Sequence, residues 1–185
     1  MLPAAAQRAF ALLSLFPAGL TRNAAQAIAD IEAETLETVV HYGMAEWRGT
    51  ADYAQCALPE PARRYAEARL AQQMPDALAT YASAALAYFA DLIEAADKAI
   101  VEGNERTGIT ILTLEQPNLE RYLDWGYEHD TTHAGINRAA RATAQLGNYW
   151  TLSGECSRPE VLARLKRALD SARRSSDTTG EATVR

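Results

Sequence analysis

The fold of this chain is decided by residues 44–58, which read MAEWRGTADYAQCAL. The helical period of the preceding residues stops here, and residues 44–48 can form a short strand. The cluster of glycine and polar residues at 49–52 indicates a turn, and residues 53–58 mix large, small and polar side chains as a half-exposed strand does. These residues therefore predict a two-stranded hairpin within a chain whose other signals are helical.

Three helices are predicted ahead of this hairpin, over residues 3–16, 23–30 and 32–42. Pro17 ends the first one, because proline disfavours helical geometry in the residue before it. Thr21 can cap the second helix, and the third has its apolar residues at helical spacing.

A fourth helix is predicted after the hairpin, with Pro61 in its first turn. Its expected apolar face comprises Ala62, Tyr65, Ala66 and Leu70. Three helices, a hairpin and a helix follow one another in the order of a winged helix. We therefore predict a winged-helix domain over residues 1–73.

Every signal from residue 74 onward is helical. The predicted helices span residues 75–101, 105–115, a segment opened by Pro117, 135–152 and 158–174. Helices of this length joined by short turns are typical of antiparallel helical hairpins, although no strict repeat spacing recurs. The fold class is therefore mainly α, with a tetratricopeptide-like (TPR-like) segment over 74–175 and a disordered polar tail over 176–185.

The last predicted helix carries both apolar and basic residues. Its apolar residues, expected to face inward, are Val161, Leu162, Leu165, Ala168 and Leu169. Its basic residues, which include Arg164 and Arg167, are interpreted as a solvated helix face.

Charge and composition exclude broad classes of function. The formal net charge is −6, whereas nucleic acid and anionic membranes need a positive protein field. No uncharged apolar run approaches the roughly 20 residues of a membrane span, and we expect no signal peptide. Cys56 and Cys156 lie far apart and indicate no disulfide framework. We therefore expect a cytoplasmic protein that does not bind membranes.

Three stretches carry a resemblance to a known family. Residues 12–21, LLSLFPAGLT, followed by AAQAI at 24–28, resemble the opening of the winged helix behind the nucleotide-binding core of STAND-type (NB-ARC) regulatory ATPases. Residues 61–70, PARRYAEARL, resemble the helix that closes this module. Residues 115–119, EQPNL, resemble the start of the first helical-repeat hairpin in bacterial signalling and transcriptional members. The resemblance covers most of residues 8–170.

This resemblance implies a non-catalytic regulatory module that binds partner proteins. In the family, the winged helix packs against a nucleotide-binding core and relays its ADP or ATP state, while the repeats sense a ligand or a partner. Two features depart from the family pattern. The chain has no G-x-x-x-x-G-K-[ST] loop, and Pro59 stands where a phosphate-sensing histidine is common. We therefore expect no cofactor, and a protein partner such as a nucleotide-binding ATPase core.

A winged helix also suggests the alternative of a DNA-binding transcriptional regulator, whose third helix would enter the major groove. Here that helix and its flank carry Asp30, Glu32, Glu34 and Glu37, and no Lys or Arg occurs at 24–46. Phosphate and guanine contacts need cations, so the sequence argues against nucleic acid.

No set of residues suggests catalysis or a metal site. His129 and His133 are four residues apart, but we interpret them as surface histidines at a turn. His41 is placed to interact with the dipole of its helix. Neither cysteine has a basic neighbour and histidine to activate it, and no strand precedes the Ser153–Ser157 turn as a nucleophile elbow would require. We therefore expect no catalytic, metal-binding or cofactor-binding residue and no enzyme activity.

Four residues are candidates for binding the partner. Glu115, Asn118 and Arg121 are placed where they can line a turn-facing groove. Trp125 can join a binding surface, although packing between helices is the favoured interpretation for both Trp125 and Trp150.

Overall fold

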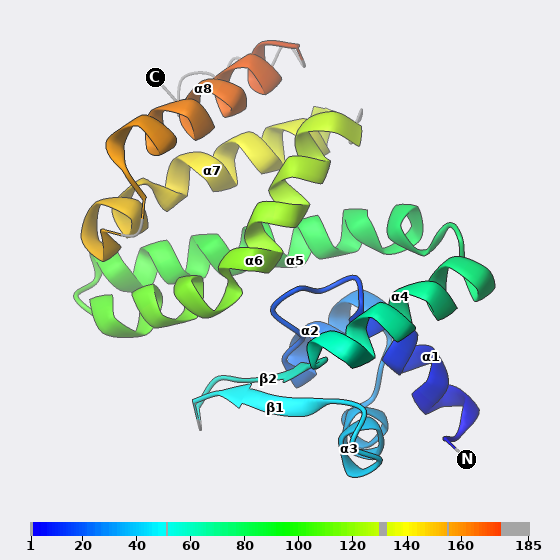
Figure 1. The fold of residues 1–185 in the computed structure, drawn as a ribbon. Helices are drawn as coiled ribbons and strands as arrows, with labels where there is room; N and C mark the ends of the chain where they lie inside the picture. Colours follow the sequence, from blue (N-terminus) through cyan, green and yellow to red (C-terminus); the bar gives the residue numbers. More distant parts are fainter. Residues whose placement is uncertain (1, 51, 130–132, 155, 175–185) are drawn as a thin grey trace. The chain divides into compact units, whose positions relative to one another are not determined.

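The structure is a computed structural model. It describes residues 2–50, 52–129, 133–154 and 156–174. The chain divides into two compact units, Met1–Ala84 and Ala85–Arg185. The described part is mainly helical with one two-stranded sheet, which confirms the predicted fold class at that level (Figure 1). The sequence predicted a domain boundary at residue 73, and the first unit ends eleven residues later.

Three helices open the first unit: α1 (Ala4–Leu13), α2 (Arg22–Ala29) and α3 (Ala33–His41). The predicted cap of α2 is present, because the Thr21 hydroxyl accepts a hydrogen bond of 3.1 Å from the amide of Ala24. This bond satisfies one of the amides that a helix start leaves without an intrahelical partner.

The predicted hairpin is confirmed, with β1 (Glu46–Gly49) pairing antiparallel to β2 (Ala54–Ala57). Trp47 lies opposite Cys56 in this register. On its other side Cys56 forms an isolated bridge with Leu20, through amide-to-carbonyl bonds of 2.8 and 3.1 Å. The loop after α1 therefore runs against the outer edge of β2.

This close approach requires a glycine beside Leu20. Gly19 has φ +86°, and a Cβ there would lie 2.4 Å from the carbonyl oxygen of Cys56. Other residues rarely adopt this backbone geometry, and none has space for a side chain at this distance.

The core of the first unit is built around α1, which packs against α3 and against α4 (Glu60–Gln73). Ala66 and Leu70 of α4 are buried as predicted, but Tyr65 is 56% exposed. The apolar face predicted for α4 therefore wrongly included Tyr65. The buried stripe follows the i, i+4 spacing of Ala66 and Leu70, and Tyr65 lies at its margin with its ring 6.1 Å from that of Phe10.

The second unit contains most of α5 (Ala77–Val101) and all of α6 (Glu105–His129), α7 (His133–Ser153) and α8 (Arg158–Arg174). Helix α6 packs against α7, α7 packs against α8, and α8 also contacts α6 (Figure 1). No helix in the described residues is both long and apolar enough to cross a membrane.

The predicted break at Pro117 is wrong, because α6 continues through this proline. Proline removes one helical hydrogen bond and crowds the preceding turn. Buried residues on both sides, Leu112 and Leu119 among them, hold the two halves in place through tertiary packing. Figure 1 shows α6 changing direction part-way along, as expected of a helix with an internal proline.

Helices α5, α6 and α7 pack through a pair of stacked aromatic rings and at a glycine. Phe89 of α5 stacks on Tyr122 of α6, with ring centroids 5.6 Å apart. A Cβ at Gly126 would lie 2.8 Å from a methyl group of Leu86 and 3.0 Å from the Cβ of Ala139. Glycine at this position therefore lets α6 approach both neighbours.

The expected inward face of α8 is wrong for Leu162, which is 59% exposed. The fully buried residues of α8 are Ala168, Ser171 and Ala172, with Val161, Leu165 and Leu169 half-buried. Leu162 lies away from the stripe that these small residues define. The predicted tail at 176–185 falls outside the described residues, as does most of the turn predicted at 129–132.

Candidate functional site

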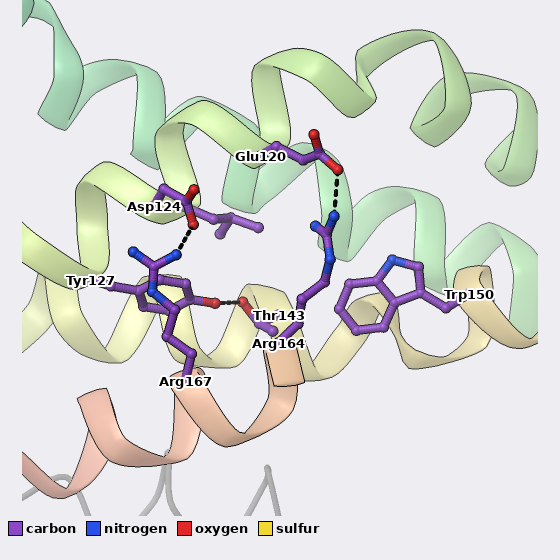
Figure 2. Close-up of a pocket in the computed structure, with 8 residues that line it drawn as sticks. Glu120, Asp124, Tyr127, Thr143, Trp150, Arg164 and Arg167 are labelled. Carbon is purple, nitrogen blue, oxygen red and sulfur yellow. Dashed lines mark hydrogen bonds and ion pairs between the residues drawn. The ribbon is translucent and has the colours of Figure 1, made fainter. Parts of the chain in front are cut away.

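A cavity of about 270 Å³ lies between α6, α7 and α8. The polar side chains around it come from all three helices: Glu120, Asp124, Tyr127, Thr143, Arg164 and Arg167 (Figure 2). Their spacing explains why they meet. The three α6 residues lie at i, i+4 and i+7 and share a helix face, and the two arginines lie three residues apart on α8.

Arg164 crosses the cavity to form an ion pair with Glu120 at 2.5 Å. Its guanidinium lies 5.9 Å from the ring centroid of Trp150, which is 5% exposed. Burial alone lowers the pKa of Arg164, but the hydrogen bond that it donates to Glu120, together with the nearby carboxylates, raises it above its ordinary value. Arg164 is therefore a permanent cation on the cavity wall.

Arg167 forms the second link between α8 and α6. Its guanidinium contacts Asp124 and donates a 2.7 Å hydrogen bond to Glu128. It also lies 5.0 Å from the ring centroid of Tyr127, within cation–π range. These ion pairs are partly exposed, so each contributes little to stability.

Two hydroxyl groups meet at the cavity, those of Tyr127 and Thr143 (Figure 2). Thr143 donates its hydrogen to the carbonyl oxygen of Ala139 at 2.8 Å, so Tyr127 is the donor in the contact between the two hydroxyls. Burial raises the pKa of Tyr127 to about 12, which keeps its phenol neutral. The Tyr127 oxygen is therefore left as an acceptor.

The structure separates the four predicted partner-binding residues into two pairs. Glu115 and Asn118 are fully buried, and the Asn118 amide donates a 2.6 Å hydrogen bond to Glu115. Arg121 and Trp125 are half-exposed, one helical turn apart. None of the four is among the residues that line the cavity.

The cavity residues were not predicted from the sequence. The α8 arginines were expected on a solvated face, whereas both are ion-paired to α6. The available signal was the pair Glu120 and Asp124, spaced four apart, together with Arg164 and Arg167, spaced three apart on a later helix, so that each pair shares one helix face.

The histidines and cysteines singled out in the sequence form no cluster in the described residues. His129 is exposed and stacks on Trp125, with ring centroids 5.7 Å apart, and the His133 side chain lies outside the described part. Both cysteines are free thiols. Burial raises the pKa of Cys56 to about 12, so this thiol stays protonated and is a poor nucleophile. Within the residues described, no group of three or more His, Cys, Asp or Glu is arranged to hold a metal.

A second ordered cluster lies on the surface of the first unit. Arg22 contacts Glu37 and lies 4.2 Å from the ring centroid of Trp47. The indole N–H of Trp47 donates to Glu37 at 3.2 Å. The pKa of Glu37 lies below its ordinary value because Arg22, and then Trp47, donate hydrogen bonds to its carboxylate. We call these three residues the Trp47 cluster.

Comparisons of the chain with protein-family models, with curated proteins and with solved structures gave no match.

Proposed function

We propose that this chain is a non-catalytic regulatory module that binds a partner protein. The first unit would act as a winged helix, and its element order of three helices, hairpin and helix supports this. The second unit would act as a set of helical hairpins, which the successive packing of α6, α7 and α8 supports. The expected partner is a nucleotide-binding ATPase core, because the family resemblance places such a core beside the winged helix. A cytoplasmic site of action suits the two free thiols.

The Trp47 cluster is the observation that carries this proposal. Tryptophan and arginine are the residue types most enriched among those that dominate binding energy at protein interfaces. Here the Trp47 ring is held by Arg22 on one face and by the carboxylate of Glu37 at its N–H. A side chain that is already ordered loses less entropy when it enters an interface. The cluster is therefore preorganised for contact with a protein.

The exposed face of α3 supports a protein partner over DNA. Glu34, Glu37 and His41 are exposed on this helix, and the flanking Glu32 is exposed too. Carboxylates placed against a phosphate backbone repel it and release no counterions. A protein surface with basic residues is the better complement.

The test is capture of the partner from extracts of the native cells, with the chain as bait and mass spectrometry as readout. We expect a protein with a nucleotide-binding ATPase domain to be enriched. Trp47→Ala should reduce its recovery about tenfold, which corresponds to the loss of roughly 1.4 kcal/mol at an interface anchor. Tyr65→Ala, which removes an exposed aromatic ring from α4, is the matched control and should leave recovery unchanged.

Three results would contradict the proposal. The first is that no nucleotide-binding protein is enriched. The second is that Trp47→Ala and Tyr65→Ala behave alike while circular dichroism shows both folded. The third is retardation of duplex DNA in a gel-shift at low salt, which would favour the transcriptional regulator instead.

A further inference from the structure

We propose that the cavity between α6, α7 and α8 binds a small zwitterion, a molecule of amino-acid size that carries one ammonium and one carboxylate group. This inference goes beyond the proposed protein contact and does not depend on it. The cavity lies wholly within the second unit, whereas the Trp47 cluster lies in the first.

The size of the cavity limits its occupant. Its volume of about 270 Å³ lies just below the roughly 300–1,000 Å³ of pockets that hold drug-sized ligands. The occupant is therefore smaller than a typical drug or a nucleotide. The buried rings of Tyr127 and Trp150 supply apolar walls, and Leu123 adds an aliphatic one.

The two arginines offer donors for a carboxylate. Each guanidinium carries five N–H groups in a planar fork. Among the described residues, α6 uses one of them on Arg164 and two on Arg167. Figure 2 shows both side chains reaching from α8 toward α6 on either side of the paired hydroxyls. A carboxylate between them would accept charge-assisted hydrogen bonds, the stronger class of such bonds.

The opposite wall offers acceptors for an ammonium. Glu120 and Asp124 each have two carboxylate oxygens, of which the ion pairs with α8 use one on each residue. The Tyr127 oxygen adds a neutral acceptor, because its own hydrogen is donated to Thr143. An ammonium group has three donors and no acceptor, which matches this wall.

The balance of charge distinguishes the zwitterion from simpler ligands. The charged side chains that line the cavity are two guanidiniums and two carboxylates, those of Glu120 and Asp124. A pure anion would be repelled by the carboxylates, and a pure cation would lie against the arginines. A neutral polyol would form only the weaker hydrogen bonds that lack a charge on the ligand. A molecule with both charges complements both walls.

The experiment titrates the full chain with the twenty common amino acids and follows the amide signals of α6, α7 and α8 by NMR. We expect at least one amino acid to shift signals around Thr143, Tyr127 and Arg164 in a saturable way. Its N-acetyl derivative lacks the ammonium group and its amide lacks the carboxylate, so each should bind at least tenfold more weakly. A hexose serves as the neutral comparison.

Variants test the site itself. Glu120→Gln keeps a hydrogen-bond acceptor for Arg164 but removes the charge that would hold the ammonium, and should weaken binding about tenfold. Glu102→Gln, just after the end of α5, is the matched control, because it also neutralises a carboxylate in an exposed ion pair but lies outside the cavity. Unchanged thermal unfolding of both variants would show that binding, not folding, is affected.

The proposal is overturned if no amino acid shifts these signals. It is equally overturned if the N-acetyl derivative, the amide or the hexose binds as well as the parent amino acid. Equal binding by the Glu120→Gln and Glu102→Gln variants would place the ligand elsewhere. These outcomes leave the capture experiment with Trp47→Ala unaffected, so the two proposals can fail separately.

Discussion

Gly19 illustrates how one residue fixes the contact between a loop and a strand. Replacing it with alanine forces a Cβ onto a backbone with φ +86°, 2.4 Å from the Cys56 carbonyl oxygen. We expect Gly19→Ala to lower the free energy of unfolding by about 2–4 kcal/mol, from the unfavourable geometry and the overpacking together. Urea unfolding of the full chain measures this change.

A second glycine provides the control. Gly147 lies within α7, and a Cβ there would meet nothing within 4 Å. Gly147→Ala should raise the free energy of unfolding by about 0.5–1 kcal/mol, because alanine loses less backbone entropy in a helix. If both substitutions changed stability in the same direction, the difference in their surroundings would not be the cause.

Cys56 shows how burial controls reactivity at a single residue. Because the pKa of its thiol is raised to about 12, we expect only Cys156 to react with a thiol reagent at pH 8 in the native chain. Both thiols should react after unfolding in guanidinium. An unfolded thiol ionises near pH 8.5 and the folded one does not, so Cys56 should also reduce stability as pH rises above that value. Rapid reaction of two thiols in the native chain would contradict this.

The residues that the sequence placed well are those whose role is local. The Thr21 cap and the hairpin over residues 46–57 depend on neighbours a few positions away. The pairing of Arg164 with Glu120 joins residues 44 positions apart, and no local pattern specifies it. Glu115 and Asn118 were expected to line a groove, but both are buried, and the Asn118 amide donates a hydrogen bond to Glu115 there.

At the scale of the elements, the buried face of α8 differs from the predicted one, and two substitutions test which residues face inward. Leu162→Lys should change the free energy of unfolding by no more than about 0.5 kcal/mol, since the side chain is already exposed. Ala168→Lys should cost about 3 kcal/mol, because it forces a charge into the packed contact of α8. Urea unfolding measures both variants. Similar losses from the two would mean that Leu162 faces inward as the sequence had suggested.

The error at α6 has a comparable physical origin. Pro117 weakens the helix locally, and sequence rules place a boundary there for that reason. The helix persists because its buried residues on both sides pack against other elements, and such packing supplies most helix stability in proteins. Only the three-dimensional contacts reveal that support, so the sequence predicted two helices where the structure has one.

At the scale of the whole molecule, α5 is the helix that joins the two units, because it runs across the boundary between them at Ala84. Ala84→Pro should cost about 3 kcal/mol by removing a helical hydrogen bond. Since each unit has its own core, hydrogen exchange should accelerate in α5 near this residue, while α1 and α7 remain protected. Ala84→Gly, which keeps the amide, should cost about 1 kcal/mol and serves as the control. Loss of protection throughout both units would mean that they fold as one.

The sequence predicted this boundary at residue 73, because the signals change there and every one from residue 74 onward is helical. A boundary inside a continuous helix leaves no such signal. The mainly α class and the position of the hairpin could be predicted from the composition and from the periodic spacing of apolar residues. The division into units depends on which side chains contact one another.

The bridge between Leu20 and Cys56 has a consequence for the behaviour of the chain at high concentration. It occupies part of the outer edge of β2, so this edge is a poor template for a strand of another molecule. The opposite edge of the sheet is formed by β1, where Glu46 and Arg48 are charged and exposed. Charged side chains on an edge strand discourage sheet extension, which protects this small hairpin from seeding fibrils.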